Sequence, residues 1–186
     1  DFIAATMSTE LTNTSKLREF VEELKRLNID IIRPSINKSF AEFKAIDGKL
    51  FYGLGAIKSV GFEAISNIIK EREKNGIYKT FADFINRVDA KDVNKLQLEG
   101  LVKAGVFDEF DKDRNKIVNS IPKIIQQIKN INDDKENHQS SLFEGQDNSH
   151  KGFDFLPHKP WKQKELLIEE FKSLGFYLSD HPLNEY

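Results

Sequence analysis

Apolar residues recur at helical spacing through most of residues 53–128, and short turns that contain glycine separate the successive stripes. Residues three and four positions apart lie on one face of a helix, so each stripe predicts a helix with one buried side. Glycine favours tight reversals of the chain between such helices. Short helices of this kind bury their apolar faces against one another. We therefore expect a mainly α fold with a minor β element.

The same periodicity predicts the individual elements. Helices are expected over residues 14–28, 55–59, 62–74, 81–88, 93–102 and 117–128, with a last one over 166–174 that ends at a glycine. Thr14 and Ser15 are the candidate N-caps of the first helix, and Asn28 is its expected left-handed stop. The dipeptide Asp47-Gly48 predicts a hairpin turn inside the β element.

The stripe over residues 117–128 contains Pro122, so it predicts either two helices or one kinked helix. Residues 131–160 are rich in Asn, Asp, Gln, Ser, His and Lys, and such a segment buries too little apolar area to offset the entropy of ordering it. We expect a mobile linker there. Helical structure is expected to resume after Trp161, and residues 176–178 look like the start of a strand.

Composition excludes several classes of protein. The 186 residues contain no cysteine, which excludes disulfides and thiolate-ligated metals. No apolar run reaches the length of about 20 residues that a membrane-spanning helix needs. The chain begins with Asp1, inside an apolar run and without the basic start of a secretory signal. We therefore expect a piece of a longer, soluble, cytoplasmic protein, whose net charge of −2 averages a basic helical region with an acidic linker.

Residues 54–65 form the strongest local motif: a short helix, a tight turn containing Gly61, and an apolar helix. This pattern is typical of a helix-hairpin-helix, in which unpaired N–H groups and the dipole at a helix N-terminus bind a phosphate without reading a base. Gly61 allows close approach, Lys58 adds a charge, and Val60 fills the space between the helices. Ser59 stands where the motif usually has its first glycine. The alternative is a plain pair of helices joined by a glycine turn.

A second motif lies in the expected linker, where Gln139 precedes the adjacent apolar pair Leu142 and Phe143. Two large apolar side chains in polar surroundings suit the pocket of a partner, and the Gln139 amide can form hydrogen bonds at the rim of such a pocket. The alternative, equally open on composition, is that Leu142 and Phe143 pack back on the helical domain.

The remaining polar clusters do not indicate a catalytic site. Asp111-Lys112-Asp113 resembles a pair of metal-binding carboxylates, but no apolar strand fixes it, so we interpret it as a solvated turn that caps a helix. The four histidines are scattered, which argues against a zinc site. Basic residues gather near the hairpin and around a later turn, and this favours contact with DNA. They are Lys58, Lys70, Arg72, Lys74 and Lys79, followed by Lys103, Lys112, Arg114 and Lys116.

Taken in order, the motifs resemble those of the alpha subunits of the bacterial replicative DNA polymerase III, the C-family polymerases. The matching runs are Phe2-Ile3-Ala4-Ala5, Pro34-Ser35-Ile36-Asn37-Lys38-Ser39, residues 52–61, residues 101–108 followed by Arg114, residues 139–143 and residues 174–183. They cover nearly the whole chain in colinear order, so the resemblance is specific.

The resemblance implies a division of the chain and a set of binding residues. Residues 1–50 would be the distal part of a fingers domain, 51–130 a tandem helix-hairpin-helix domain that binds DNA, 131–160 a flexible linker, and 161–186 a helix with the start of a β-barrel domain. The residues that would contact DNA are Lys58, Ser59, Val60, Gly61, Lys103, Gly105 and Arg114. Those that would bind the sliding clamp are Gln139, Leu142 and Phe143.

The resemblance also implies that the parent protein is a DNA-directed DNA polymerase that works with duplex primer-template, a sliding clamp and other replicase subunits, and with no membrane. Its catalytic aspartates, which would hold Mg2+, would precede Asp1. The present chain would then hold no cofactor and would be inactive alone. Two alternatives are a free-standing helix-hairpin-helix adaptor without catalytic activity and a structural helical domain that binds no DNA.

Overall fold

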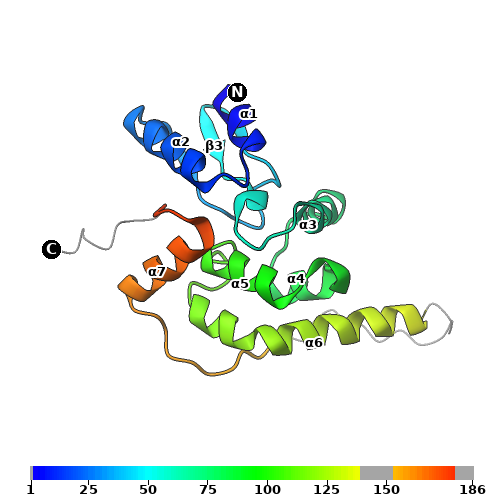
Figure 1. Cartoon of the computed structure of the whole chain (residues 1–186). Coiled ribbons are helices and arrows are strands. Elements are labelled where there is room, and N and C mark those ends of the chain that lie inside the picture. The colour runs from blue at the N-terminus through cyan, green and yellow to red at the C-terminus, as the bar shows by residue number, and fades with distance from the viewer. Residues whose placement is uncertain (1, 139–152, 179–186) are drawn as a thin grey trace.

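The structure is a computed structural model, and it describes residues 2–138 and 153–178 (Figure 1). The described part is mainly helical, with one small sheet, as the sequence predicts. Its elements are α1 (Phe2–Thr9), α2 (Thr14–Arg26), β1 (Ile31–Ile32), β2 (Lys44–Ile46), β3 (Lys49–Phe51), the 3-10 turn η1 (Leu54–Ala56), α3 (Phe62–Asn75), α4 (Phe81–Arg87), the 3-10 turn η2 (Ala90–Asp92), α5 (Lys95–Lys103), α6 (Arg114–His138) and α7 (Gln163–Leu174).

The N-terminal part packs α1 and α2 against a three-stranded sheet in the order β1-β3-β2. Strand β3 pairs in parallel with β1 and antiparallel with β2. Asp47 and Gly48 join β2 to β3 with left-handed φ angles of 51° and 75°. Two consecutive left-handed residues are what a two-residue hairpin of type I′ requires. The hairpin predicted at this dipeptide is therefore confirmed.

Helix α2 has the predicted extent but a different cap. The side-chain oxygen of Asn13 accepts the N–H of Lys16 at 3.2 Å, so Asn13 is the N-cap instead of Thr14 or Ser15. The helix buries Leu17, Val21 and Leu24, which lie on one face. Asn28 follows the helix with φ 55°, the left-handed stop that was expected. Helix α1 carried no helical signal in the sequence pattern.

Helices α3 to α6 form the larger part of the molecule, with α6 running beneath α4 and α5 in Figure 1. Their shared core is aromatic: the ring centroid of Phe107 lies 5.2 Å from that of Phe81 and 4.9 Å from that of Phe84. Pro122 lies inside α6, which is one continuous helix and not two. A stripe of buried isoleucines holds α6 against α4 and α5, which favours the helix despite the missing N–H group. These are Ile117, Ile121, Ile124 and Ile128.

Three expectations about extent are wrong. Helix α6 continues to His138, beyond the expected start of the linker at residue 131. The helix expected over residues 55–59 is only the 3-10 turn η1, because Ile57 is extended and the N–H of Lys58 bonds to Ser173 of α7. Residues 176–178 form no strand among the described residues; Phe176 and Leu178 are instead buried in the core.

The far end of the expected linker also packs on the helices. The rings of Phe153 and Phe155 lie 6.3 and 5.4 Å from that of Phe81. The N–H of Leu156 donates to the buried hydroxyl of Ser120 at 3.0 Å. Two phenylalanines thus order a segment whose average composition is polar, because they reach an aromatic core already present.

Candidate nucleic-acid interface

The predicted hairpin joins η1 to α3 and has a well-defined backbone. Ile57 is extended, Ser59 has φ 67°, and Gly61 is the residue before α3, with φ −72° and ψ 132°. Val60 is 8% exposed, and its side chain faces Gly100 of α5. Helix α5 therefore supports the buried side of the turn, whereas Lys58, Ser59 and Gly61 are exposed.

The left-handed position of this turn is Ser59 and not Gly61. A residue other than glycine in this region costs about 1–2 kcal/mol because its Cβ crowds the following carbonyl oxygen. The left-handed backbone at this position explains why the motif usually has a glycine there. Ser59 adopts the same conformation and bears the strain.

Gly61 has no conformational reason to be glycine. Its φ is ordinary, and a Cβ built on it would meet only the Cβ of Ala64, at a relaxed 3.9 Å. The fold would thus tolerate a small side chain here. Because Gly61 has no side chain, the surface beside the first turn of α3 is uncovered. Backbone N–H groups face outward there.

No side chain in the described parts of the chain caps the N-terminus of α3. The first N–H that bonds to the backbone is that of Ile65, which donates to the carbonyl of Gly61 at 3.0 Å. The three preceding N–H groups and the positive end of the helix dipole therefore face solvent. Lys58 is exposed beside them, and Glu63 contributes one opposing negative charge in the first turn.

The second hairpin joins α5 to α6, and it differs from the first in that a side chain caps its second helix. A carboxylate oxygen of Asp113 accepts the N–H of Lys116 at 3.1 Å and so caps α6. Asp111 accepts the N–H of Asp113 at 2.9 Å and pairs with the ammonium of Lys116. The interpretation of this acidic pair as a capping turn is confirmed. A carboxylate already occupies the site that is open at α3.

Arg114 lies inside the second hairpin. It is 4% exposed, and its guanidinium donates two hydrogen bonds to Asp108, at 2.9 and 2.7 Å, and one to the carbonyl of Lys103 at 3.0 Å. Burial by itself lowers the pKa of Arg114, but the hydrogen bonds and charge of Asp108 outweigh burial and raise it. A Cβ on Gly105, whose φ is 83°, would overlap the same guanidinium.

These contacts engage Arg114 and Gly105, both expected to contact DNA, inside the protein. The guanidinium is enclosed by protein acceptors, and Gly105 gives it room. Lys103 is also engaged, because its ammonium lies 3.0 Å from a carboxylate oxygen of Glu169 in α7 and its side chain is 23% exposed. Within the expected basic face, Arg72 is likewise buried and donates to the carbonyls of Ile36 and Ser39.

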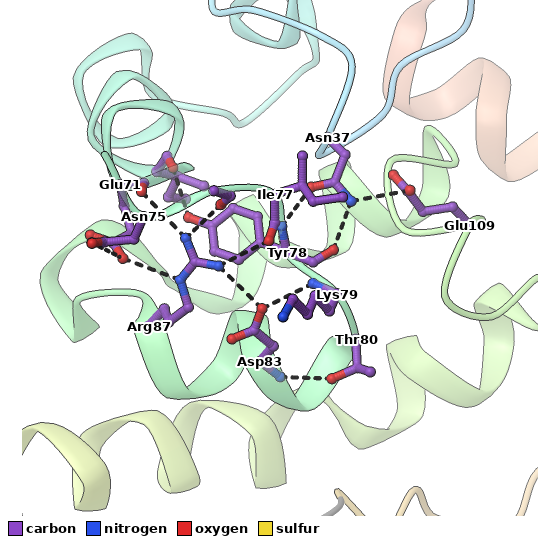
Figure 2. Close-up of polar contacts among 12 residues, drawn as sticks. Asn37, Glu71, Asn75, Ile77, Tyr78, Lys79, Thr80, Asp83, Arg87 and Glu109 are labelled. Atoms are coloured by element: carbon purple, nitrogen blue, oxygen red, sulfur yellow. Dashed lines mark hydrogen bonds and ion pairs between the residues drawn. The ribbon is translucent and has the colours of Figure 1, made fainter. Parts of the chain in front are cut away.

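Figure 2 shows a polar network that the sequence analysis did not identify. Arg87 of α4 donates to Glu71, Asp83 and the carbonyls of Gly76 and Ile77, which fixes the loop between α3 and α4. Its guanidinium also stacks on Tyr78, 4.3 Å from the ring centroid. The spacing of the sequence could have indicated only the i,i+4 pair of Asp83 and Arg87 on α4, because the other partners lie on α3 and in the loop after it.

Asn37 joins the N-terminal part to this loop (Figure 2). Its amide oxygen accepts the N–H of Tyr78 and its amide nitrogen donates to the carbonyl of Tyr78, both at 2.8 Å. The same nitrogen donates to Glu109 of the second hairpin at 3.1 Å. The Pro34-to-Ser39 run, which carried part of the resemblance, thus has a structural function.

The remaining predicted site residues, Gln139, Leu142 and Phe143, lie outside the described residues. Among the residues that are described, no helix is long and apolar enough to cross a membrane. The same residues contain no group of three or more His, Cys, Asp or Glu side chains placed to hold a metal ion.

Comparison with known proteins agrees with the hairpin geometry. The family described as "Helix-hairpin-helix motif" matches residues 28–117, which include both hairpins. Residues 28–117 therefore form a domain of the helix-hairpin-helix class.

Similarity to individual proteins indicates which kind of helix-hairpin-helix protein the chain resembles. The chain is 40% identical over 188 residues to the DNA polymerase III subunit alpha of Borreliella burgdorferi, 37% identical to that of Caulobacter vibrioides and 36% identical to that of Campylobacter jejuni. All of the chain is covered in each case, and it spans 16% of the length of each relative. Over its whole length the chain is therefore similar to one segment of the DNA polymerase III alpha subunits.

Proposed function

We propose that this chain binds duplex DNA for a bacterial replicative DNA polymerase, and that this binding is independent of base sequence. The observation that carries the proposal is the N-terminus of α3, where no described side chain caps the helix and where Gly61 lacks a side chain that the fold would tolerate. The similarity to DNA polymerase III alpha subunits and the helix-hairpin-helix match support the same conclusion.

The chemistry follows from the geometry of the turn. A phosphate oxygen placed beside Gly61 accepts hydrogen bonds from the first N–H groups of α3 and lies at the positive end of the helix dipole. Lys58 adds a charge, and Ser59 adds an exposed hydroxyl. Val60 supports the turn from inside. These groups meet only the sugar-phosphate backbone, so binding depends on salt and not on base sequence.

Substitution of Gly61 tests this proposal. Gly61→Val places a branched side chain over the open N–H groups, and we expect duplex affinity to fall about tenfold, a change of about 1.4 kcal/mol. The loss should be equal for two duplexes of unrelated sequence. Electrophoretic retardation over a series of salt concentrations measures both effects.

A lysine pair provides the matched control. Lys58→Ala should reduce the salt slope of binding by about one, whereas Lys49→Ala, an exposed lysine in the β-hairpin, should leave it unchanged. If Gly61→Val binds duplex like the unchanged chain, or if the unchanged chain discriminates between the two sequences, the proposal is wrong.

We further propose that residues 139–143 attach the parent polymerase to the sliding clamp. The support is the sequence pattern, an amide at Gln139 followed by adjacent large apolar residues at Leu142 and Phe143. The full chain carrying Leu142→Ala with Phe143→Ala should lose binding to immobilised clamp and keep its affinity for duplex. Clamp binding that survives this double substitution would exclude the assignment.

The activity of the whole protein is part of the proposal. The name of the relatives supports a DNA polymerase. We propose further that the whole protein acts in the cytoplasm on primer-template with other replicase subunits, using Mg2+ bound by residues outside this chain. The alternative is a free-standing helix-hairpin-helix adaptor. A reading frame that extends upstream with paired aspartates distinguishes the polymerase from the adaptor.

A further inference from the structure

Helix α7 lies outside the 28–117 segment that matches the helix-hairpin-helix family, yet it contacts both hairpins through Lys58 and Arg114. In Figure 1 it lies beside α5. The carbonyl of Ser173 accepts the N–H of Lys58 at 2.9 Å, in the turn of the first hairpin. The hydroxyl of Ser173 donates to the carbonyl of Gly100 in α5 at 2.6 Å.

The preceding residues of α7 reach the second hairpin. Glu170 is 1% exposed, and its carboxylate lies 3.5 Å from the guanidinium of Arg114. Glu169 lies 3.0 Å from the ammonium of Lys103. Three positions on one face of α7 thus bind the turn before α3, the end of α5 and the start of α6.

The contact at Lys58 uses the free end of a helix. The carbonyl of Ser173 is among the last four of α7, which have no donor within the helix. On the other side of the turn, a Cβ at Gly100 would lie only 2.6 Å from the carbonyl of Lys58. The Lys58 backbone is therefore enclosed between α5 and α7.

The next residue, Ser59, is the one in the left-handed region, with φ 67°. A strained conformation of this kind persists only where the surrounding contacts hold it. The hydrogen bond from Lys58 to Ser173 is such a contact, one residue from the strain and three from Gly61. The geometry of the phosphate-binding turn therefore depends on α7.

We propose that α7 is part of the DNA-binding unit and that Ser173 is a positioning residue for the phosphate-binding turn. Ser173 acts through the Lys58 backbone and does not itself touch DNA. This inference rests on the proposed function of the hairpin. It extends that unit beyond residue 117 and makes the hairpin sensitive to the placement of the last turn of α7.

The test uses the full chain and Ser173→Ala, which removes the hydroxyl bond to Gly100 and loosens the end of α7. Hydrogen exchange at the Lys58 amide, followed by NMR, should become about tenfold faster. Duplex affinity should fall about threefold to tenfold. The matched control is Ser120→Ala in α6, which removes another buried hydroxyl, one whose hydrogen-bond partners are Lys116 and Leu156 and not α5 or the Lys58 turn. Ser120→Ala should leave both measurements unchanged.

A rescue separates positioning from general destabilisation. Ser59→Gly relieves the strain that α7 is inferred to hold, so Ser173→Ala should cost less duplex affinity in the Ser59→Gly chain than in the unchanged chain. Both members of the Ser59→Gly pair lack the Ser59 hydroxyl, so its own contribution to binding cancels in this comparison. Unchanged Lys58 exchange and duplex affinity in Ser173→Ala, or an equal loss in Ser120→Ala, would overturn the inference. If at the same time Gly61→Val weakens duplex binding, the proposed function stands and only the role of α7 fails.

Discussion

At the residue scale, the two positions of the hairpin where the motif usually has glycine differ in backbone conformation. The left-handed residue is Ser59, and Gly61 has an ordinary backbone conformation. The preference for glycine at position 59 comes from the left-handed backbone there and concerns stability. Under the proposed function, the small residue at Gly61 leaves room for a phosphate and concerns binding.

The strain at Ser59 can be measured. Ser59→Gly should increase the free energy of unfolding by about 0.5–1 kcal/mol, because the relief of left-handed strain exceeds the added entropy of the unfolded chain. Urea unfolding measures the change. Ser15→Gly, in the first turn of α2, is the control and should be neutral or destabilising. A loss of stability in Ser59→Gly would show that the position bears no strain.

Two buried arginines show that residue type alone does not identify a phosphate contact. In the sequence, Arg72 and Arg114 both look like candidates for phosphate contact, yet each is buried and donates to acceptors within the protein. A guanidinium offers five donors in a fixed fork, which suits it equally to a phosphate and to a cluster of carbonyls and carboxylates. Only the position of those acceptors in space distinguishes the two uses.

At the scale of elements, α7 is connected to the helical domain by ion pairs as well as by apolar contacts. Burial by itself raises the pKa of the Glu169 carboxyl, but hydrogen bonds from Lys172 and Lys103 outweigh burial and lower it. A carboxyl whose pKa is lower in the folded state stabilises the fold at neutral pH. That contribution is lost as the pH falls through the folded pKa.

Glu169→Gln should therefore cost about 0.5–1 kcal/mol of unfolding free energy at neutral pH. The difference from the unchanged chain should shrink as the pH falls and disappear below the lowered pKa of Glu169 in the folded state, where the carboxyl is uncharged like the glutamine amide. Urea unfolding at a series of pH values measures this. Glu22→Gln, which breaks the exposed pair with Arg18, should have little effect at any pH. A difference that persists undiminished in acid would exclude the ion pairs as its cause.

At the scale of the whole molecule, Asn37 connects the sheet-containing part to both the α3–α4 loop and the second hairpin. Asn37→Ala removes its hydrogen bonds to Tyr78 and Glu109 and should lower the free energy of unfolding by about 1–3 kcal/mol. Urea unfolding followed by circular dichroism measures the loss. Asn75→Ala, which removes one exposed bond to Glu71, is the control. Equal losses in the two variants would mean that Asn37 does not join the parts.

The sequence predicted α2, α3, the β-hairpin and the capping role of Asp113 well, because each depends on residues a few positions apart. It predicted the start of the linker wrongly, since α6 continues to His138. It also missed the packing of Phe153 and Phe155, because their partner, Phe81, is remote in the chain. For the candidate site, it identified the turn at Lys58 to Gly61 but not the contacts that hold it.

The sequence by itself determined the helical class, the position of the open hairpin and the resemblance to polymerase alpha subunits, because periodicity, turn chemistry and colinear motifs are local or cumulative along the chain. Tertiary structure alone decided that Ser59 takes the left-handed conformation, that Arg114 faces inward, and that Ser173 holds Lys58. Each of these depends on which groups from distant segments supply space or hydrogen-bond partners. Those contacts exist only once the chain has folded.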